Sequence, residues 1–249
     1  MNIHKLTYAL FILLFATLAL AVGRHQQPRR GQAPDNEYVK QQQDRRLRFP
    51  VADYDEKDLA DPKKNEALKQ KKLRKNDFKL VARNPPSWQV ERLVINEGGL
   101  DFPALPVAQS TLIILGRVTA AEAHVSENKK NVYSEFTVLS EKVFKSSRSP
   151  VVEGTEITVD RVGGYVKYPN GYTVLYHISG TNMPLIGERY LFFLTSKNQQ
   201  DFSILTAYEL GEKAVAPLDN SSQFEQYRGL TETALLENLR DAIAKSSSH

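Results

Sequence analysis

Apolar residues dominate the second half of the chain, where they recur in short segments with the spacing of β-strands. Residues 111–120 are apolar on both faces at first and then alternate, as expected of a central strand. Residues 132–145 predict a second, longer strand, in which the apolar positions change face near Ser140. Because side chains alternate strictly along a regular strand, this change of face predicts a β-bulge near Ser140.

Turn residues separate the segments that follow. Pro169-Asn170-Gly171 is typical of a tight hairpin turn, and Gly163-Gly164 predicts another turn. We predict further strands at residues 155–160, 165–168, 172–177, 188–195 and 202–209, and either a strand or a packing segment at 88–95. Short strands at this spacing predict a mainly β fold: a small antiparallel, OB-like barrel, closed or nearly closed, over residues 88–215.

The chain ends in a predicted amphipathic helix. Within residues 231–245, Leu235, Leu236, Leu239 and Ile243 recur at helical spacing and form one apolar stripe. We expect the C-terminal region, residues 216–249, to pack on the barrel through this stripe.

Residues 1–22 have the pattern of an N-terminal leader. Lys5 precedes a 17-residue apolar run that ends near Ala19-Leu20-Ala21, a small-x-small motif typical of signal-peptide cleavage. The run is also close to the length of about 20 residues that spans a bilayer. Two outcomes are left open: a signal peptide cleaved after Ala21, or an uncut transmembrane helix that binds the membrane. Both predict the cell envelope, with a periplasmic, secreted or membrane-anchored protein.

Between the leader and the barrel the chain is polar and basic. Residues 23–87 predict a largely disordered linker with almost no apolar periodicity at its start. A short helix over residues 62–75 is compatible with Asp61 as N-cap and Pro62 at the first helical position. Its apolar stripe is too narrow to stabilise an isolated helix.

Charge is distributed unevenly along the chain. Residues 24–95 carry 18 Lys/Arg and 11 Asp/Glu, a net charge of +7, whereas residues 96–249 carry 14 and 18, a net charge of −4. A basic segment of this kind fits a location near anionic lipid, nucleic acid or an acidic polymer, and fits equally a solvated linker. Because phosphate neutralisation dominates nucleic-acid affinity, the acidic barrel segment makes nucleic acid an unlikely partner.

Few residues suggest catalysis. The chain has no cysteine, which excludes disulfides, Cys-ligated zinc and thiol nucleophiles, and it has no phosphate-binding loop or zinc-protease motif. We therefore expect no cofactor and no metal. His177 and Ser179 lie two residues apart on one predicted strand and so share a face, which leaves a hydrolase-type enzyme as an alternative.

Two surfaces are candidate ligand-binding faces. The first is the predicted hairpin loop with Lys129 and Lys130, continued by Tyr133 and Glu135, which look outward if Phe136 is in the core. The second combines basic residues with tyrosines that can stack on a ligand. Its members are Arg161, Tyr165, Lys167, Tyr168, Tyr172 and Tyr176, and His177 lies beside them.

Three segments carry a resemblance to known proteins: residues 105–118, residues 124–136 and residues 188–194. Together they resemble a group of small exported bacterial proteins of uncharacterised function with an OB-like barrel. The resemblance covers residues 103–210 and implies a fold and export, but no activity. The leading hypothesis is a non-enzymatic, exported or membrane-tethered binding module for an unknown protein, peptide or glycan. The alternatives are the hydrolase and OB-type binding of single-stranded nucleic acid.

Overall fold

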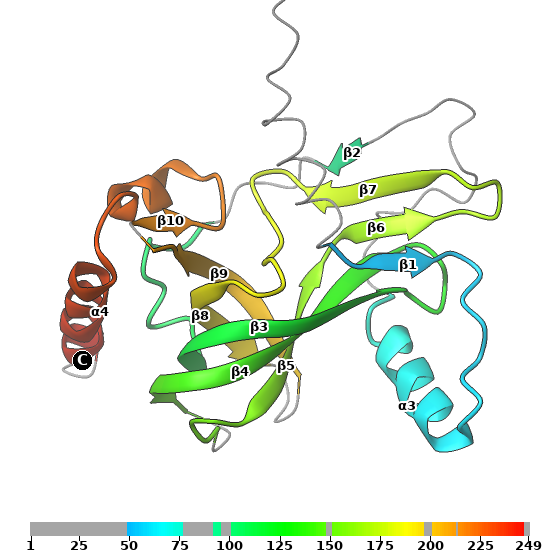
Figure 1. Ribbon diagram of the computed structural model, residues 1–249, viewed down its shortest axis with the longest axis horizontal. Helices are drawn as coiled ribbons and strands as arrows, with labels where there is room; N and C mark the ends of the chain where they lie inside the picture. Colours follow the sequence, from blue (N-terminus) through cyan, green and yellow to red (C-terminus); the bar gives the residue numbers. More distant parts are fainter. Residues whose placement is uncertain are drawn as a thin grey trace, which may run out of the picture. The chain divides into compact units, whose positions relative to one another are not determined.

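The computed structural model describes residues 49–76, 101–147, 151–196, 201–212 and 214–246, together with the backbone of residues 92–95. All of them belong to one compact unit, residues 45–249. The unit is mainly β (Figure 1). Its elements are β1 (Val51–Asp53), α3 (Pro62–Leu73), β2 (Arg92–Ile95), β3 (Leu112–Val125), β4 (Val132–Ser146), β5 (Glu156–Val162), β6 (Gly164–Lys167), β7 (Thr173–Ile178), β8 (Arg189–Ser196), β9 (Phe202–Leu210), β10 (Val215–Pro217), the 3-10 helix η1 (Ser222–Tyr227) and α4 (Glu232–Ser246).

Five strands of the larger sheet pair in a ring. In order around it, β3 pairs with β4, β4 with β5, β5 with β9, β9 with β8, and β8 with β3. Every pairing is antiparallel except that of β5 with β9, which is parallel and consists of Val159 with Phe202 and Asp160 with Ser203. The predicted antiparallel β fold with a C-terminal helix is therefore confirmed. The ring is not a cleanly closed barrel, because its β5–β9 seam is so short.

Apolar side chains fill the interior of the ring. They alternate along β3, β4 and β8 and include Phe136 and Phe192, both fully buried. The bulge predicted near Ser140 is present: the β3–β4 register steps from Leu115 opposite Lys142 to Gly116 opposite Ser140. Glu141 is thereby left without an opposite residue, and the apolar face changes there.

A smaller sheet, ordered β1-β6-β7-β2, packs against the far ends of β3 and β4. The predicted hairpin is confirmed, since β6 and β7 pair around a turn in which Gly171 has a φ of 86°. A left-handed glycine is also required where β5 leads into β6. Gly163 has a φ of 110°, and a Cβ atom there would lie 2.9 Å from the carbonyl oxygen of Tyr176.

Helix α4 covers the outer face of the ring on the side of β3 and β8. The hydroxyl of Thr231 accepts a hydrogen bond from the backbone N–H of Ala234 at the start of the helix. Leu235 and Leu239 are fully buried in a second apolar cluster, which also holds the outward-facing residues Ile113 and Phe193. The predicted amphipathic helix and its packing are confirmed.

The structure departs from the expectation that residues 23–87 form a largely disordered linker. Residues 51–53 form β1, which pairs in parallel with β6, and Ala52 is 1% exposed. Helix α3 follows, with Asp61 as N-cap as predicted, accepting hydrogen bonds from the backbone N–H groups of Lys63 and Lys64. The physical reason is that strand pairing and ion pairs to the barrel supply the stabilisation that the narrow apolar stripe lacks. Residues 23–48 and 77–87 lie outside the described residues.

Within the described ranges, no helix combines the length and the apolar character that a bilayer crossing requires. The predicted leader, residues 1–22, lies outside these ranges.

Candidate functional site

Three carboxylates from neighbouring strands form a continuous row on the side of the ring that faces α3. Glu122 of β3 is directly opposite Glu135 of β4, and Glu135 is directly opposite Asp160 of β5. Directly paired residues have Cβ atoms about 4.5–5.5 Å apart, and like charges in such positions repel each other. Glu135 and Asp160 are only 9% and 6% exposed, so solvent screens them poorly. We call Glu122, Glu135 and Asp160 the acidic row.

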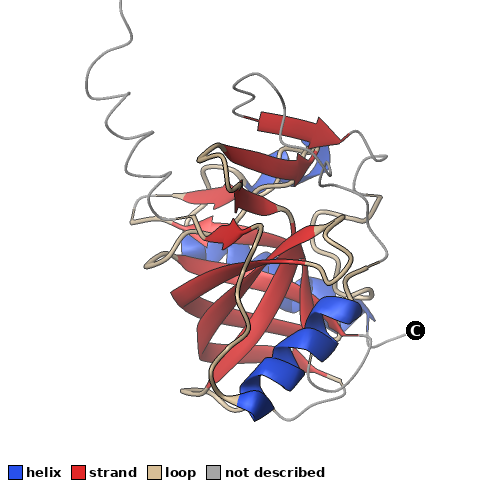
Figure 2. Cartoon of the chain, turned by 90° about the vertical axis from the view of Figure 1, so that its right-hand side faces the viewer, coloured by secondary structure: helices blue, strands red, loops and turns tan. Residues whose placement is uncertain are grey.

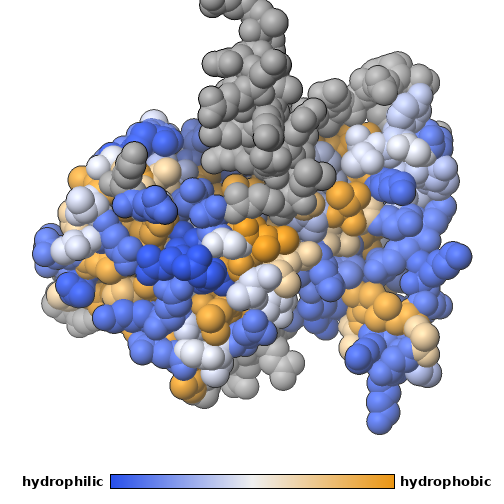
Figure 3. All heavy atoms as spheres, in the orientation of Figure 1, coloured by the Kyte–Doolittle hydropathy of each residue, from blue (hydrophilic) through white to orange (hydrophobic). Residues whose placement is uncertain are grey.

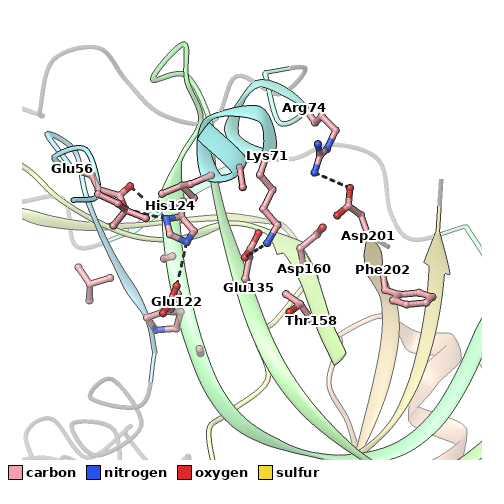
Figure 4. A pocket seen from close by; sticks show the side chains of 17 residues that line it. Glu56, Lys71, Arg74, Glu122, His124, Glu135, Thr158, Asp160, Asp201 and Phe202 are labelled. Atoms are coloured by element: carbon pink, nitrogen blue, oxygen red, sulfur yellow. Dashed lines mark hydrogen bonds and ion pairs between the residues drawn. The ribbon is translucent and has the colours of Figure 1, made fainter. Parts of the chain in front are cut away.

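Basic residues of α3 and the following turn neutralise this row (Figure 4). Lys71 Nζ lies 2.5 Å from Glu135 Oε2, and Lys75 Nζ lies 2.6 Å from Asp160 Oδ2. Arg74 makes a third ion pair, of 3.1 Å, with Asp201 at the start of β9. The side chains that meet the acidic row thus come from the segment that sequence analysis assigned to the basic linker.

Amide groups fix the C-terminal end of α3 to the β3–β4 loop. The side-chain amide of Asn131 donates to the carbonyl of Lys75 at 3.0 Å. Asn128 donates to Asn76 twice, from its backbone N–H and from its side-chain amide, both at 3.1 Å. No residue within α3 is buried. Polar contacts, rather than apolar packing, therefore hold this helix, which faces the viewer in Figure 2.

A polar cavity of about 800 Å³ lies between α3 and the strands. The acidic row, Glu56, Asp201 and His124 contribute its polar wall, and Lys71 and Arg74 contribute cations from the helix side. The remaining lining residues are Pro50, Val51, Leu59, Ala67, Leu68, Ala121, Ala123, Thr158 and Phe202. The surface around α3 is mixed in Figure 3, with a hydrophobic patch at the helix bordered by hydrophilic residues.

Glu56 and His124 form a second charged cluster at the edge of the cavity. His124 Nδ1 lies 3.3 Å from Glu56 Oε1, and its Nε2 lies 3.6 Å from Glu122 Oε2. Lys72 Nζ lies 2.6 Å from Glu56 Oε2. Partial burial of Glu56 acts to raise its pKa, but the hydrogen bonds from His124 and Lys72 and their charges outweigh burial and lower the pKa. Glu56 therefore remains ionised under mildly acidic conditions.

Two polar atoms beneath α3 have no hydrogen-bond partner among the described residues. One is Oε1 of Glu135, whose other oxygen binds Lys71, and the other is the hydroxyl of Tyr133. Tyr133 is fully buried, with Lys75 Nζ 5.6 Å from the centre of its ring. Burial, followed by the nearby charges of Glu135, Glu56 and Asp160, raises the pKa of Tyr133 well above its ordinary value. The phenol therefore stays neutral.

Replacing Tyr133 with phenylalanine is expected to raise the free energy of unfolding by about 1 kcal/mol, because a buried hydroxyl without a partner carries a desolvation cost. Urea denaturation of the full chain measures this change. Tyr190→Phe is a matched control, since the Tyr190 hydroxyl accepts a hydrogen bond from the N–H of Leu185 at 3.0 Å and its removal should be destabilising. A loss of stability in Tyr133→Phe similar to that in the control would contradict this assignment.

The first predicted ligand-binding face is partly assembled. Glu135 lines the cavity and Tyr133 lies beside it on the same face of β4, opposite to Phe136 as predicted. Both were expected to look outward, but α3 covers that face and the two side chains are buried. Lys129 lies in the β3–β4 loop, where its Nζ is 2.7 Å from Asp55 Oδ1 and 4.7 Å from the centre of the Tyr54 ring. Lys130 follows it in the loop and is half-buried.

The second predicted face does not form. Arg161 is buried, with Nη2 2.7 Å from Asp219 and Nη1 donating to the carbonyl of Asn182. Tyr168 and Tyr176 are also buried, and their hydroxyls hydrogen-bond to each other inside the smaller sheet.

The other residues proposed for the second face are dispersed. Tyr165 packs on Phe49, with ring centres 6.0 Å apart, whereas Tyr172 is exposed beside the β6–β7 turn. His177 is 6% exposed, and its Nδ1 lies 3.4 Å from the carbonyl oxygen of Thr181. Ser179, two residues on, is half-buried.

Most of the charged residues of the site were missed in the sequence. Nothing in the linear pattern marks Glu122, Asp160 or Asp201. Strand register brings Glu122 and Asp160 beside Glu135, and Asp201 joins the site through its ion pair with Arg74. The signal in the sequence that could have indicated this site is the opposite net charge of the two halves of the chain. The basic segment has its acidic partner in the same chain.

No group of three His, Cys, Asp or Glu residues in the described part of the chain is placed to hold a metal ion. No protein-family model matches this sequence, and a search of curated proteins finds no match to it.

Proposed function

We propose that the chain is a non-enzymatic binding module of the cell envelope, and that its ligand site is the cavity between α3 and the acidic row. The observation that carries this proposal is Glu135. It is a carboxylate that is nine-tenths buried, lines the cavity and keeps one oxygen without a hydrogen-bond partner among the described residues. Native proteins rarely leave such an atom unsatisfied, so a ligand or ordered water is expected at Oε1.

The order of strands around the ring supports an OB-type barrel as the scaffold. Counted along the chain, the ring runs first, second, third, fifth, fourth, with a weak seam between third and fifth. OB barrels are five-stranded and partly open, and they bind ligands on the face of strands two and three and on the loops joining strands one to two and four to five. Here Glu135 and Asp160 lie on strands two and three. Asn128 and Asn131 lie in the loop that joins strands one and two, and Asp201 is the last residue of the loop that joins strands four and five.

The charge of the site argues against nucleic acid as its ligand. Barrel strands contribute Glu122, Glu135 and Asp160 to the cavity, and a phosphate backbone would be repelled by them. For the hydrolase alternative, His177 would need to reach a substrate, but it is buried, with its Nδ1 3.4 Å from the carbonyl oxygen of Thr181. The assignment to the envelope rests on the leader pattern of residues 1–22.

Solution NMR on the isotopically labelled full chain tests this proposal. The probes are a Lys/Arg-rich 16-residue peptide, a Glu/Asp-rich 16-residue peptide, an N-acetylglucosamine tetramer and a 12-nucleotide oligothymidylate. At least one of the first three is expected to shift the amide signals of Ala121, Ala123 and Thr158, which line the cavity. The shifts should be weakened or lost in Thr158→Trp, which places a bulky side chain in the cavity, and persist in Thr173→Trp, placed on an exposed position of β7.

Two results would overturn the proposal. One is the absence of shifts at these three residues with each of the first three probes, whether or not the oligothymidylate causes shifts. The other is sustained hydrolysis of ester, peptide or glycan substrates that is lost in His177→Ala while the melting temperature is retained.

A further inference from the structure

We infer that the acidic row is a docking site for a cationic helical segment of another protein, and that α3 is the chain's own occupant of this site. The inference rests on the proposed function and adds the chemistry of the ligand. The acidic row recognises two basic side chains placed one helical turn apart.

The spacing of the charges on the two sides matches. Lys71 lies in α3 and Lys75 in the turn that follows the helix, so the two lysines are four residues apart, a separation that on a continuous helix places Cβ atoms about 5–6 Å from each other on one face. Their partners Glu135 and Asp160 are a directly opposed cross-strand pair, with Cβ atoms about 4.5–5.5 Å apart. Each lysine therefore meets its own carboxylate, with N–O distances of 2.5 and 2.6 Å.

The acidic row needs a cationic partner. Two nearly buried carboxylates face each other across β4 and β5, and Glu122 extends the row onto β3. The strand residues that line the cavity include no Lys or Arg, so every basic side chain there comes from α3 or its C-terminal cap. Without α3 the row would be a set of unneutralised carboxylates, which is unfavourable unless another cation replaces the helix.

Helix α3 is suited to being replaced. None of its own residues is buried, so the helix contributes no side chain to the apolar core. Two of the ion pairs that hold it are partly open to solvent, with the side chains of Lys71 and Arg74 29% and 49% exposed, whereas the side chains of Lys72 and Lys75 are 15% and 18% exposed. Such contacts weaken as salt is added. A segment of another protein with the same basic spacing can make the same contacts and, in addition, satisfy Glu135 Oε1.

The experiment uses the full chain carrying Lys71→Glu and Lys75→Glu, which repel the acidic row and undock α3. The probe is a fluorescent synthetic peptide with the sequence of residues 59–76. The peptide is expected to bind this variant at least about tenfold more tightly than the unmodified chain. In the latter, the tethered helix competes at an effective concentration in the millimolar range. Adding Glu135→Gln and Asp160→Asn to the variant should abolish binding.

Two controls make the result specific. Lys63→Glu with Lys69→Glu makes the same change of charge at exposed positions of α3 that form no ion pair with the described residues, and it should leave peptide binding as weak as in the unmodified chain. A peptide of the same composition, rearranged so that no two basic residues are four apart, should bind at least about tenfold more weakly than the native sequence.

The inference is overturned if the undocked variant keeps its barrel, as judged by its melting temperature, and does not bind the peptide. It is overturned equally if binding survives Glu135→Gln/Asp160→Asn or is the same for the rearranged peptide. If the peptide fails while one of the other NMR probes still shifts Ala121, Ala123 and Thr158, the proposed function stands and only the cationic ligand is excluded. If the peptide does not bind and none of these probes shifts the three signals, both the inference and the proposed function are overturned.

Discussion

Replacing Arg161 with alanine is expected to lower the free energy of unfolding by about 3–5 kcal/mol, the cost of leaving one member of a buried ion pair alone. The side chain of Asp219 is fully buried and that of Arg161 is 5% exposed, and their N–O distance is 2.7 Å. Without the guanidinium, Asp219 keeps a hydrogen bond from the N–H of Asn182 but no countercharge from Arg161. Urea denaturation of the full chain, followed by circular dichroism, measures the loss.

Arg117→Ala is the matched control for this prediction. Arg117 also pairs with a carboxylate, but its side chain is 45% exposed and lies 3.7 Å from Glu141. Exposed pairs of this kind contribute about 0–1 kcal/mol. Equal losses for the two variants, or a loss below about 1 kcal/mol for Arg161→Ala, would show that Arg161 is not the structural residue described above.

Glu135→Gln combined with Asp160→Asn is expected to release α3 while leaving the barrel intact. The two substitutions remove the carboxylates that bind Lys71 and Lys75. We estimate that the two ion pairs together contribute about 2 kcal/mol of docking free energy, because the carboxylates are nearly buried and the lysine side chains are partly exposed. This corresponds to about 30-fold faster amide hydrogen exchange in α3. The barrel itself should unfold at the same or higher urea concentration, because the repulsion between the two carboxylates is removed as well.

The readout of this second prediction separates a docked helix from a general loss of stability. Glu237→Gln with Asp241→Asn removes the same charges from exposed positions of α4 and should leave exchange in α3 unchanged. If exchange in α3 and in β3–β5 accelerates by the same factor, the acidic row is a structural part of the barrel and not a docking surface.

Alternating apolar residues were sufficient to predict the longer strands of the ring, whereas the three-residue strands β1 and β10 were not predicted. The segment predicted at 172–177 is β7 (Thr173–Ile178), and that predicted at 202–209 is β9 (Phe202–Leu210). The bulge near Ser140 was predicted for the same reason. When one face of a strand is buried, apolar residues occupy every second position, so a shift of this alternation by one residue marks the bulge. The C-terminal helix followed from its stripe of leucines.

The candidate site was predicted less well, because it depends on which residues lie opposite each other. Glu135 was selected as a ligand-binding residue, but Glu122 and Asp160 become its neighbours only through strand register. β1 has three residues and no readable pattern, so its pairing with β6 is a tertiary effect. Arg161 was selected as a surface cation, whereas its partner Asp219 lies far along the chain and draws it inward. The opposite net charges of the two segments were informative. However, the sequence analysis proposed a partner for the basic segment outside the protein, whereas the structure pairs it with carboxylates of the same chain.

Carbodiimide cross-linking tests the central claim, that the basic helix lies on the acidic row, most directly. This reagent joins a lysine amine to a carboxylate in contact with it, without a spacer. Mass spectrometry of the full chain at low salt should find Lys71 linked to Glu135 and Lys75 linked to Asp160, with both links much reduced in 1 M NaCl. If neither link forms while the Lys129–Asp55 pair of the β3–β4 loop, 2.7 Å apart, is joined in the same sample, α3 does not occupy the acidic row.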